Sequence, residues 1–148
     1  MREILFRGKR MDNGEWVEAA SILRTVDGAV RELYIAAKAG MDMALDADGN
    51  IHTMTAGPHV LYYRVDPDTL GQFTGLTDKN GKKVFEGDVC RFYGDEGYAD
   101  YAIFWDGSDS GWSVRQNDSE TLDVLDSYFA EHCTVIGNIH DNPELLNQ

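Results

Sequence analysis

The chain has 148 residues, of which 43% are hydrophobic and 11% aromatic. This is the composition of a globular chain rather than a disordered one, and the length suits one ordinary domain or two small ones sharing a core. The net charge of −13, from 26 acidic and 13 basic side chains, disfavours direct nucleic-acid binding, because polyanions are bound chiefly by basic side chains. The basic run at residues 7–10 leaves a local exception open, and solubility is the simplest explanation of the charge.

Nothing in the sequence indicates export or membrane insertion. The N-terminal segment has only three apolar residues, Ile4, Leu5 and Phe6, before the next charge, so it lacks the apolar core of a secretory signal. No stretch approaches the roughly 20 apolar residues of a membrane span. We therefore expect a cytoplasmic protein with no membrane partner, in which Cys90 and Cys133 are buried thiols rather than a disulfide.

Asn-Gly or Asp-Gly dipeptides recur along the chain and predict antiparallel hairpins. Each tolerates the positive φ of a type I′ turn. Residues 3–9 and 15–20 read as paired strands around the first dipeptide, and residues 41–45 and 51–55 around the third. The five dipeptides are Asn13-Gly14, Asp27-Gly28, Asp48-Gly49, Asn80-Gly81 and Asp106-Gly107.

The second half of the chain contains the most apolar strand candidates, at residues 89–93, 101–105 and 112–114. Large apolar side chains occupy both faces of 101–105, which predicts a central strand or one covered by another subunit. Residues 133–140 read as a last strand. Pro143, preceded by Asn142 as a cap, then suits the first turn of a short terminal helix.

One helix is expected at residues 119–132. Leu122, Leu125 and Phe129 recur at helical spacing, and Asn117 with Glu120 has the spacing of a capping box. Residues 31–38 are a weaker helix candidate, and a strand is nearly as compatible with their pattern.

These elements predict a mainly β chain, of a β-rich α+β class. We expect antiparallel hairpins in an N-terminal β region, residues 1–65, and a C-terminal small SH3-like barrel with one short helix, residues 66–148. The sequence shows no internal repeat, and no flexible linker separates the two regions.

Three stretches in a fixed order resemble the YopX family, which occurs in bacteriophages and in bacterial prophages. They are MREILFRGK at 1–9, GQFTGLTDKNGKKVFEGDV at 71–89 and VIGNIHDNPELL at 135–146. The resemblance covers the first hairpin and most of the chain beyond residue 65, while residues 19–63 carry no signature. It implies a mainly β fold, homo-oligomeric assembly and a phage context, so the cytoplasm expected from the sequence is that of a bacterial host. It implies no activity and no catalytic or ligand residues.

The middle stretch has a structural interpretation that we prefer to a functional one. Its glycines relieve steric limits on tight backbone, and its Gly-Asp-Val element resembles the start of a strand in SH3-like barrels, a fold-level analogy. The functional alternative treats Asp78, Glu86 and Asp88 as an acidic cluster. The motif residues are Gly71, Gln72, Phe73, Thr74, Gly75, Asp78, Asn80, Gly81, Glu86, Gly87 and Asp88.

The sequence lacks the common patterns of catalytic and metal sites. Aligning Gly49 or Gly81 with the glycine of a calcium loop leaves the first and last ligand positions without oxygen donors of the right kind. Cys-x-x-Cys spacing, a nucleophile elbow and a phosphate-binding loop are all missing. A dyad of Cys90 and His132 would require tertiary contact, and two core residues are the simpler explanation. We therefore expect no enzyme activity, no cofactor and no metal.

Three hypotheses for function follow. The first is a non-enzymatic phage or prophage accessory protein that acts as a homo-oligomeric protein-binding or scaffold module, with itself and a host or phage protein as partners. The second is an acidic nucleic-acid mimic that inhibits a host DNA-binding or defence protein. The third, a small hydrolase or metal-dependent enzyme, has the least support. For an interface we expect aromatic and apolar residues, namely Tyr93, Tyr101, Ile103, Trp105 and Trp112.

Overall fold

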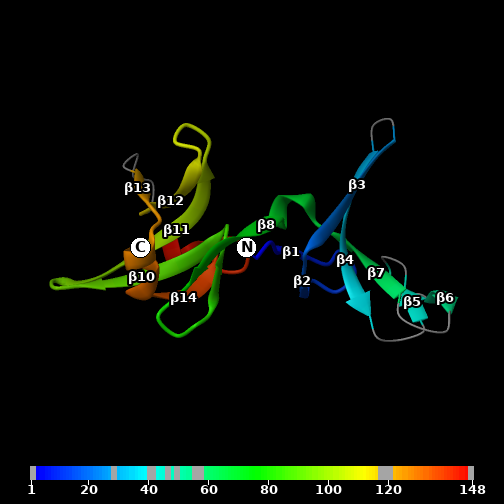
Figure 1. Cartoon of the computed structure of the whole chain (residues 1–148), viewed down its shortest axis with the longest axis horizontal. Coiled ribbons are helices and arrows are strands. Elements are labelled where there is room, and N and C mark those ends of the chain that lie inside the picture. Colours follow the sequence, from blue (N-terminus) through cyan, green and yellow to red (C-terminus); the bar gives the residue numbers. More distant parts are fainter. Residues whose placement is uncertain are drawn as a thin grey trace. The chain divides into compact units, whose positions relative to one another are not determined.

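The computed structural model describes residues 3–27, 30–39, 43–45, 48, 51–54, 59–116 and 122–146 (Figure 1). Residues 3–72 form one compact unit, here the N-terminal unit, and residues 73–148 form most of a second, the C-terminal unit. The predicted boundary lay between residues 65 and 66. Strands dominate both units, which confirms the mainly β class.

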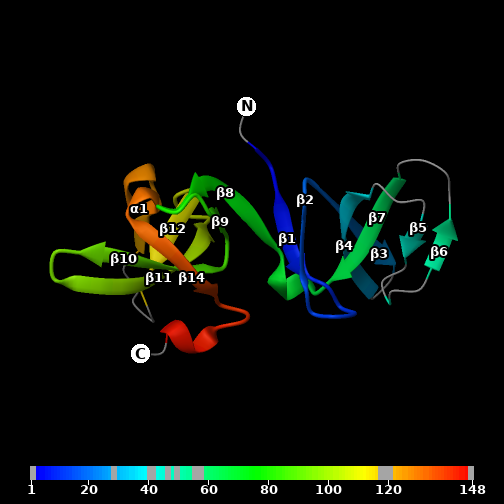
Figure 2. The same ribbon diagram turned by 90° about the horizontal axis from the view of Figure 1, so that it is seen from below.

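Short antiparallel hairpins build the N-terminal unit (Figure 2). The first hairpin pairs Phe6 with Ala19 and Lys9 with Trp16, and β1 also pairs with the first two residues of β8. A three-stranded sheet has the order β3-β4-β7, and β5 pairs with β6. Both predicted hairpins are therefore confirmed. The strands are β1 (Phe6–Lys9), β2 (Trp16–Ala19), β3 (Ser21–Asp27), β4 (Val30–Ala39), β5 (Met43–Leu45), β6 (Ile51–Met54) and β7 (His59–Val65), followed by a 3-10 helix, η1 (Pro67–Thr69). Strand β8 (Gly71–Thr77) begins in this unit, and its residues from Phe73 onward belong to the C-terminal unit.

Residues 31–38 lie within strand β4, so the strand alternative was correct and the helix was wrong. The buried side chains Leu33 and Ile35 alternate with the half-buried Tyr34, which is the two-residue period of a strand. Leu33 and Ile35 form the core of this unit together with Val65.

A five-stranded antiparallel sheet forms the body of the C-terminal unit, in the order β13-β12-β11-β10-β14. The predicted strands are confirmed, and β11 is central because it pairs with both β10 and β12. One face of the sheet packs a core of Val84, Cys90, Ile103, Val114, Leu125, Cys133 and Val135. The elements are β9 (Lys83–Phe85), β10 (Asp88–Gly94), β11 (Gly97–Asp106), β12 (Gly111–Arg115), β13 (Leu122–Val124), α1 (Ser127–Glu131), β14 (Cys133–Asn138) and the 3-10 helix η2 (Pro143–Leu146).

The predicted helix at 119–132 is wrong in its first half. Leu122 pairs with Arg115 and Val124 with Ser113, so this segment extends the sheet as β13. The helix α1 begins only after Asp126, whose side chain accepts a hydrogen bond from the Phe129 backbone N–H at 2.8 Å. Pairing with β12 satisfies the backbone hydrogen-bonding groups of residues 122–124. The spacing of two leucines in the sequence does not indicate whether such pairing occurs. Asn117 and Glu120 lie outside the described residues.

The turns largely follow the dipeptides. Gly14 and Gly81 adopt φ of 72° and 82°, whereas at the Asp106-Gly107 turn it is Ser110, with φ of 51°, that takes the left-handed conformation. Gly28 and Gly49 lie outside the described residues, although the strands that they join are paired. The short terminal helix is confirmed as η2, and the last strand ends at Asn138 rather than at residue 140.

The pairings of the described residues leave the five-stranded sheet open, with β13 and β14 as its outer strands, so they do not form a closed barrel. No helix within the described ranges is long and apolar enough to cross a membrane.

Replacing Gly137 with Ala should destabilise the C-terminal unit. A Cβ at Gly137 would lie 2.5 Å from Asn142 Oδ1 and 3.0 Å from Leu145 Cδ1, so β14 and η2 would have to move apart. We expect a loss of about 1–3 kcal/mol in the free energy of unfolding, measured by urea titration. Gly107→Ala is the matched control because a Cβ there meets nothing within 4 Å. Equal midpoints for the two variants would contradict this packing.

Candidate interaction surface

The buried carboxylate of Asp78 organises the middle motif. Its Oδ1 accepts hydrogen bonds from the backbone N–H groups of Asn80 and Lys82, each at 2.9 Å, and thereby shapes the turn between β8 and β9. Its Oδ2 accepts a third bond, at 3.0 Å, from the N–H of Val135 in β14. The side chain, 5% exposed, therefore ties a hairpin turn to a strand 57 residues further along the chain.

The acidity of Asp78 reflects this structural role. Burial raises the pKa of the carboxyl group, but hydrogen bonds from the N–H groups of Val135, Lys82 and Asn80 lower it more, so the net pKa lies below the ordinary value of 3.8. The ionised form is the one the fold stabilises.

The other motif residues also have structural positions. Asp88 is 1% exposed and its Oδ2 accepts from the Phe85 N–H at 2.8 Å, which closes the Glu86-Gly87 turn. Gly75 and Gly87 adopt φ of 92° and 89°, conformations that favour glycine. Gly71 and Gln72 pair with β1, and the ring of Phe73 contacts the ring of Phe85. The Thr74 hydroxyl donates a hydrogen bond to the Val84 carbonyl. Glu86 is half-buried beside the turn.

The described residues do not gather into a reactive centre. No group of three His, Cys, Asp or Glu side chains among them could hold a metal ion. Cys90 and Cys133 are free, buried thiols, and a hydrogen bond between them together with burial raises the pKa of the Cys90 thiol. His132 is exposed, and its Nδ1 donates to the Tyr128 carbonyl at 2.7 Å, so this nitrogen is directed at α1 rather than at Cys90.

The predicted interface residues occupy different environments. Ile103 is 1% exposed and lies in the core, so it is unavailable to a partner. Tyr101 and Trp112 are half-buried, whereas Tyr93 and Trp105 are about half exposed. In the C-terminal unit, two further exposed aromatic residues lie outside the predicted set, namely Tyr98 at 58% and Tyr128 at 63% exposure.

Four of these aromatic residues form two pairs near opposite ends of strand β11. At its C-terminal end, Trp105 pairs across the sheet with Trp112, and their rings meet edge to face at 5.1 Å. At the β10–β11 turn, Tyr98 faces Tyr93 across the hairpin with ring centroids 6.3 Å apart. A strand rises about 3.3 Å per residue, so Tyr98 and Trp105 lie roughly 23 Å apart.

Cations already cover the Tyr93 and Tyr98 face of the hairpin. The guanidinium of Arg91 lies over the Tyr98 ring at 4.0 Å and donates two hydrogen bonds to Asp100, at 2.8 and 3.0 Å. The ammonium of Lys79 lies 4.5 Å from the centre of the Tyr93 ring.

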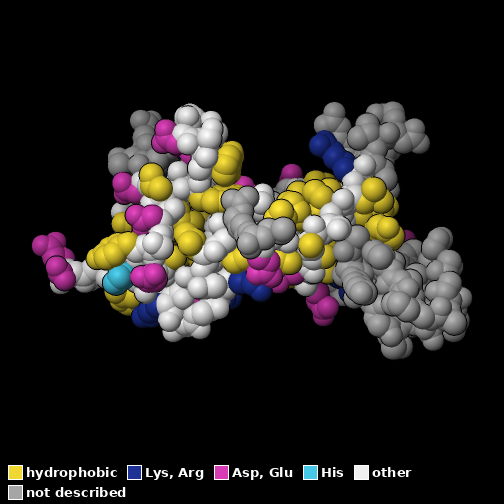
Figure 3. All heavy atoms as spheres, viewed as in Figure 1, with side chains coloured by type: hydrophobic (Ala, Val, Ile, Leu, Met, Phe, Trp, Pro, Cys, Tyr) yellow, Lys and Arg dark blue, Asp and Glu magenta, His cyan; other side chains and the backbone are white. Residues whose placement is uncertain are grey.

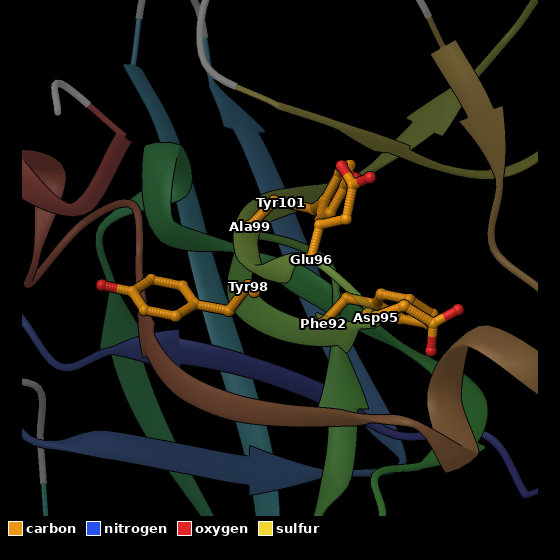
Figure 4. A pocket seen from close by; sticks show the side chains of 8 residues that line it. Phe92, Asp95, Glu96, Tyr98, Ala99 and Tyr101 are labelled. Atoms are coloured by element: carbon orange, nitrogen blue, oxygen red, sulfur yellow. The ribbon is translucent and has the colours of Figure 1, made fainter.

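The opposite face of the hairpin contains an open hollow of about 470 Å³. Figure 4 shows the carboxylates of Asp95 and Glu96 on the same side as the rings of Phe92 and Tyr101, while the Tyr98 ring points the other way. Gly94, Gly97, Tyr98 and Ala99 complete the lining.

Negative charge is concentrated in the C-terminal unit. Between residues 73 and 148 there are 15 acidic and five basic side chains. Hydrophobic and acidic side chains lie next to one another over the face of this unit in Figure 3. A surface with this excess of negative charge repels a polyanion.

Comparison with known proteins bears on family and fold. A family model described as YopX protein matches residues 5–147. The crystal structure of protein EF1440 from Enterococcus faecalis is similar, with a TM-score of 0.52 and 20% sequence identity over 99% of each chain. At that identity the similarity shows the fold alone. No curated protein matches the chain.

Asp78→Asn should destabilise the protein because an amide cannot accept all three backbone hydrogen bonds as a carboxylate does. We expect a loss of about 2 kcal/mol or more in the free energy of unfolding near neutral pH, by urea titration. The control is Asp109→Asn, which removes the same charge from an exposed carboxylate in a turn. This substitution should change the free energy of unfolding by less than about 0.5 kcal/mol.

The cost of Asp78→Asn should also depend on pH. The folded pKa of Asp78 is below its unfolded value, so the stabilisation is fully present above pH 3.8 and is lost as pH falls through the folded pKa. The difference in unfolding free energy between wild type and Asp78→Asn should therefore shrink on acidification below pH 3.8. A difference that stays constant would contradict the assignment.

Proposed function

The chain belongs to the YopX family, and we propose that it is a non-enzymatic phage or prophage accessory protein that binds other proteins, including copies of itself. The observation that carries the proposal is the set of exposed aromatic side chains on the C-terminal unit, Tyr93, Tyr98, Trp105 and Tyr128. Tyrosine and tryptophan are enriched at protein interfaces because they bury a large apolar area and keep a polar handle.

The absence of an enzymatic role is part of this proposal. Its support is that the two most buried motif carboxylates, Asp78 and Asp88, accept hydrogen bonds from backbone N–H groups. The two thiols are likewise buried against each other. Groups held in this way stabilise the fold and are poorly placed to meet a substrate.

Self-association is proposed to use the Trp105 and Trp112 pair. Trp105 is 50% exposed although it lies on a central strand, and Trp112 supports its ring from the neighbouring strand. A second copy would cover this apolar surface, and one large aromatic residue at the centre of an interface commonly contributes much of the affinity.

We also propose the finer fold assignment of the C-terminal unit, a small SH3-like barrel. It is supported by a meander from β10 to β13 followed by β14, which returns to pair with β10. We propose the bacterial cytosol as the location, supported by the free thiols of Cys90 and Cys133, a state that a reducing compartment maintains.

Sedimentation velocity at micromolar concentrations tests self-association. We expect an oligomer that Trp105→Ala weakens at least about ten-fold in dissociation constant, because such a residue contributes more than about 1.4 kcal/mol. Tyr62→Ala, which removes another exposed aromatic side chain in the N-terminal unit, should leave the oligomer unchanged. A strict monomer of the wild-type protein would contradict the proposal.

Salt provides a second readout for the same interface. Copies of an acidic chain repel each other, and about 500 mM NaCl screens this repulsion far more than about 50 mM does. Self-association through tryptophan should therefore strengthen with salt. A pronounced weakening would point to an interface held by ion pairs instead.

The second candidate function is an acidic mimic of nucleic acid, favoured by the concentration of carboxylates between residues 73 and 148. A mimic would occupy the basic groove of a host protein with strongly salt-dependent affinity. A pull-down from host lysate at low salt tests it. Recovery of no nucleic-acid-binding protein would rule the mimic out.

A further inference from the structure

We propose that the hollow on the β10–β11 hairpin binds an arginine side chain presented by a basic segment of a partner protein. The inference rests on the proposed protein-binding function and names the partner chemistry of one surface. The hollow lies at the end of β11 opposite to the tryptophan pair, so self-association through Trp105 would leave it open.

The residues that line the hollow lie on one face of the hairpin or in its turn, except Tyr98, whose ring points to the other face (Figure 4). Phe92 pairs with Ala99, Gly94 pairs with Gly97, and Tyr101 lies on the same face, opposite Cys90. Directly opposed residues of an antiparallel pair project to the same side. The hollow is therefore a defined surface of a two-stranded ribbon, with aromatic rings at its base and glycines near its tip.

Helix α1 holds the two rings in place. Phe129 stacks on Phe92 with centroids 5.1 Å apart and an interplanar angle of 18°, and it meets Tyr101 edge to face at 5.3 Å. Phe129 itself is half-buried against the sheet core. Rings that are fixed before binding lose little conformational freedom when a ligand arrives.

The carboxylates of the hollow are available to a ligand. Asp95 and Glu96 are exposed, and neither side chain forms a hydrogen bond or ion pair with any part of the chain that the structure describes. On the other face of the hairpin, by contrast, Asp100 already binds Arg91 through two hydrogen bonds. The hollow therefore offers negative charge without a cation of its own.

This combination favours a guanidinium group over other ligands. A guanidinium is planar, so it can stack on an aromatic face, and its fork of N–H donors matches carboxylates. A phosphate or carboxylate ligand would meet only repulsion from Asp95 and Glu96. The volume of about 470 Å³ falls in the ordinary range for ligand sites and has room for the end of a long side chain.

The test is a titration of the full-length chain followed by backbone NMR shifts. The probes are short peptides, acetyl-Gly-Gly-Arg-Gly-Gly-amide and the same peptide with citrulline, which keeps the shape of arginine and lacks its charge. The arginine peptide should shift amides between residues 92 and 101 and bind at least about five-fold more tightly than the citrulline peptide, because cation–π attraction and ion pairing are both lost with the charge. Raising NaCl from about 50 to about 500 mM should weaken it.

Two variants separate charge from shape. Glu96→Gln should weaken the arginine peptide about three-fold, whereas Asp109→Asn, with the same change in net charge on an exposed turn, should have no measurable effect. Gly94→Leu should abolish binding by filling the hollow. Gly94 has ordinary strand backbone, and a Cβ added there would meet only a carbonyl oxygen, 3.9 Å away, so that variant should fold.

Equal affinities for the arginine and citrulline peptides would overturn the proposal. So would equal losses in Glu96→Gln and Asp109→Asn, because they would show diffuse attraction to an acidic chain. The peptide titration tests only binding at the hollow, whereas sedimentation velocity tests self-association. Failure of the arginine site can therefore be distinguished from failure of the proposed function.

Discussion

The C-terminal unit depends on one buried carboxylate. Asp78 shapes the turn before β9 with two of its hydrogen bonds and holds the backbone of β14 with the third. The strand β14 follows α1 after one residue, so fixing β14 also fixes the helix against the sheet. The helix supplies Phe129, which positions the rings of Phe92 and Tyr101. A structural contact in the family motif thus helps to determine the shape of a surface at the β10–β11 hairpin.

The local chemistry of turns explains which parts of the fold could be predicted. An Asn-Gly or Asp-Gly pair constrains a few neighbouring residues, and the strands on either side then pair with each other, as β1 does with β2. The helix at 119–132 failed because Leu122 and Leu125 are compatible with either state. Pairing with β12, a contact made through tertiary structure, decided for a strand. Likewise, the alternation of side chains along a strand puts Ile103 and Trp105 on the same face of β11. Only the folded structure shows that Ile103 is buried in the core and Trp105 is exposed.

The candidate surface was less predictable than the fold. Asp95 and Glu96 look like an ordinary acidic turn in the sequence, and Phe92 looks like a core residue. Their association depends on hairpin register and on α1, which contributes Phe129 from 37 positions beyond Phe92. One sequence feature could have indicated the hollow, namely the glycines at 94 and 97 on either side of Asp95 and Glu96. Because glycine has no side chain, these positions leave space at the tip of the β10–β11 hairpin. Membership of the YopX family and the shared fold of EF1440 do not specify a function.

Our two proposals assign different partners to the two ends of β11, with the tryptophan pair binding copies of the chain and the acidic aromatic hollow binding a basic partner. Hydrogen–deuterium exchange of the wild-type protein over a range of concentrations tests the first half of this account directly, because amides at an interface lose access to solvent as copies associate. We expect protection to rise with concentration in peptides containing Trp105 and Trp112 and to stay constant in peptides covering residues 92–98. Exchange at Trp105 and Trp112 that is independent of concentration would contradict the account.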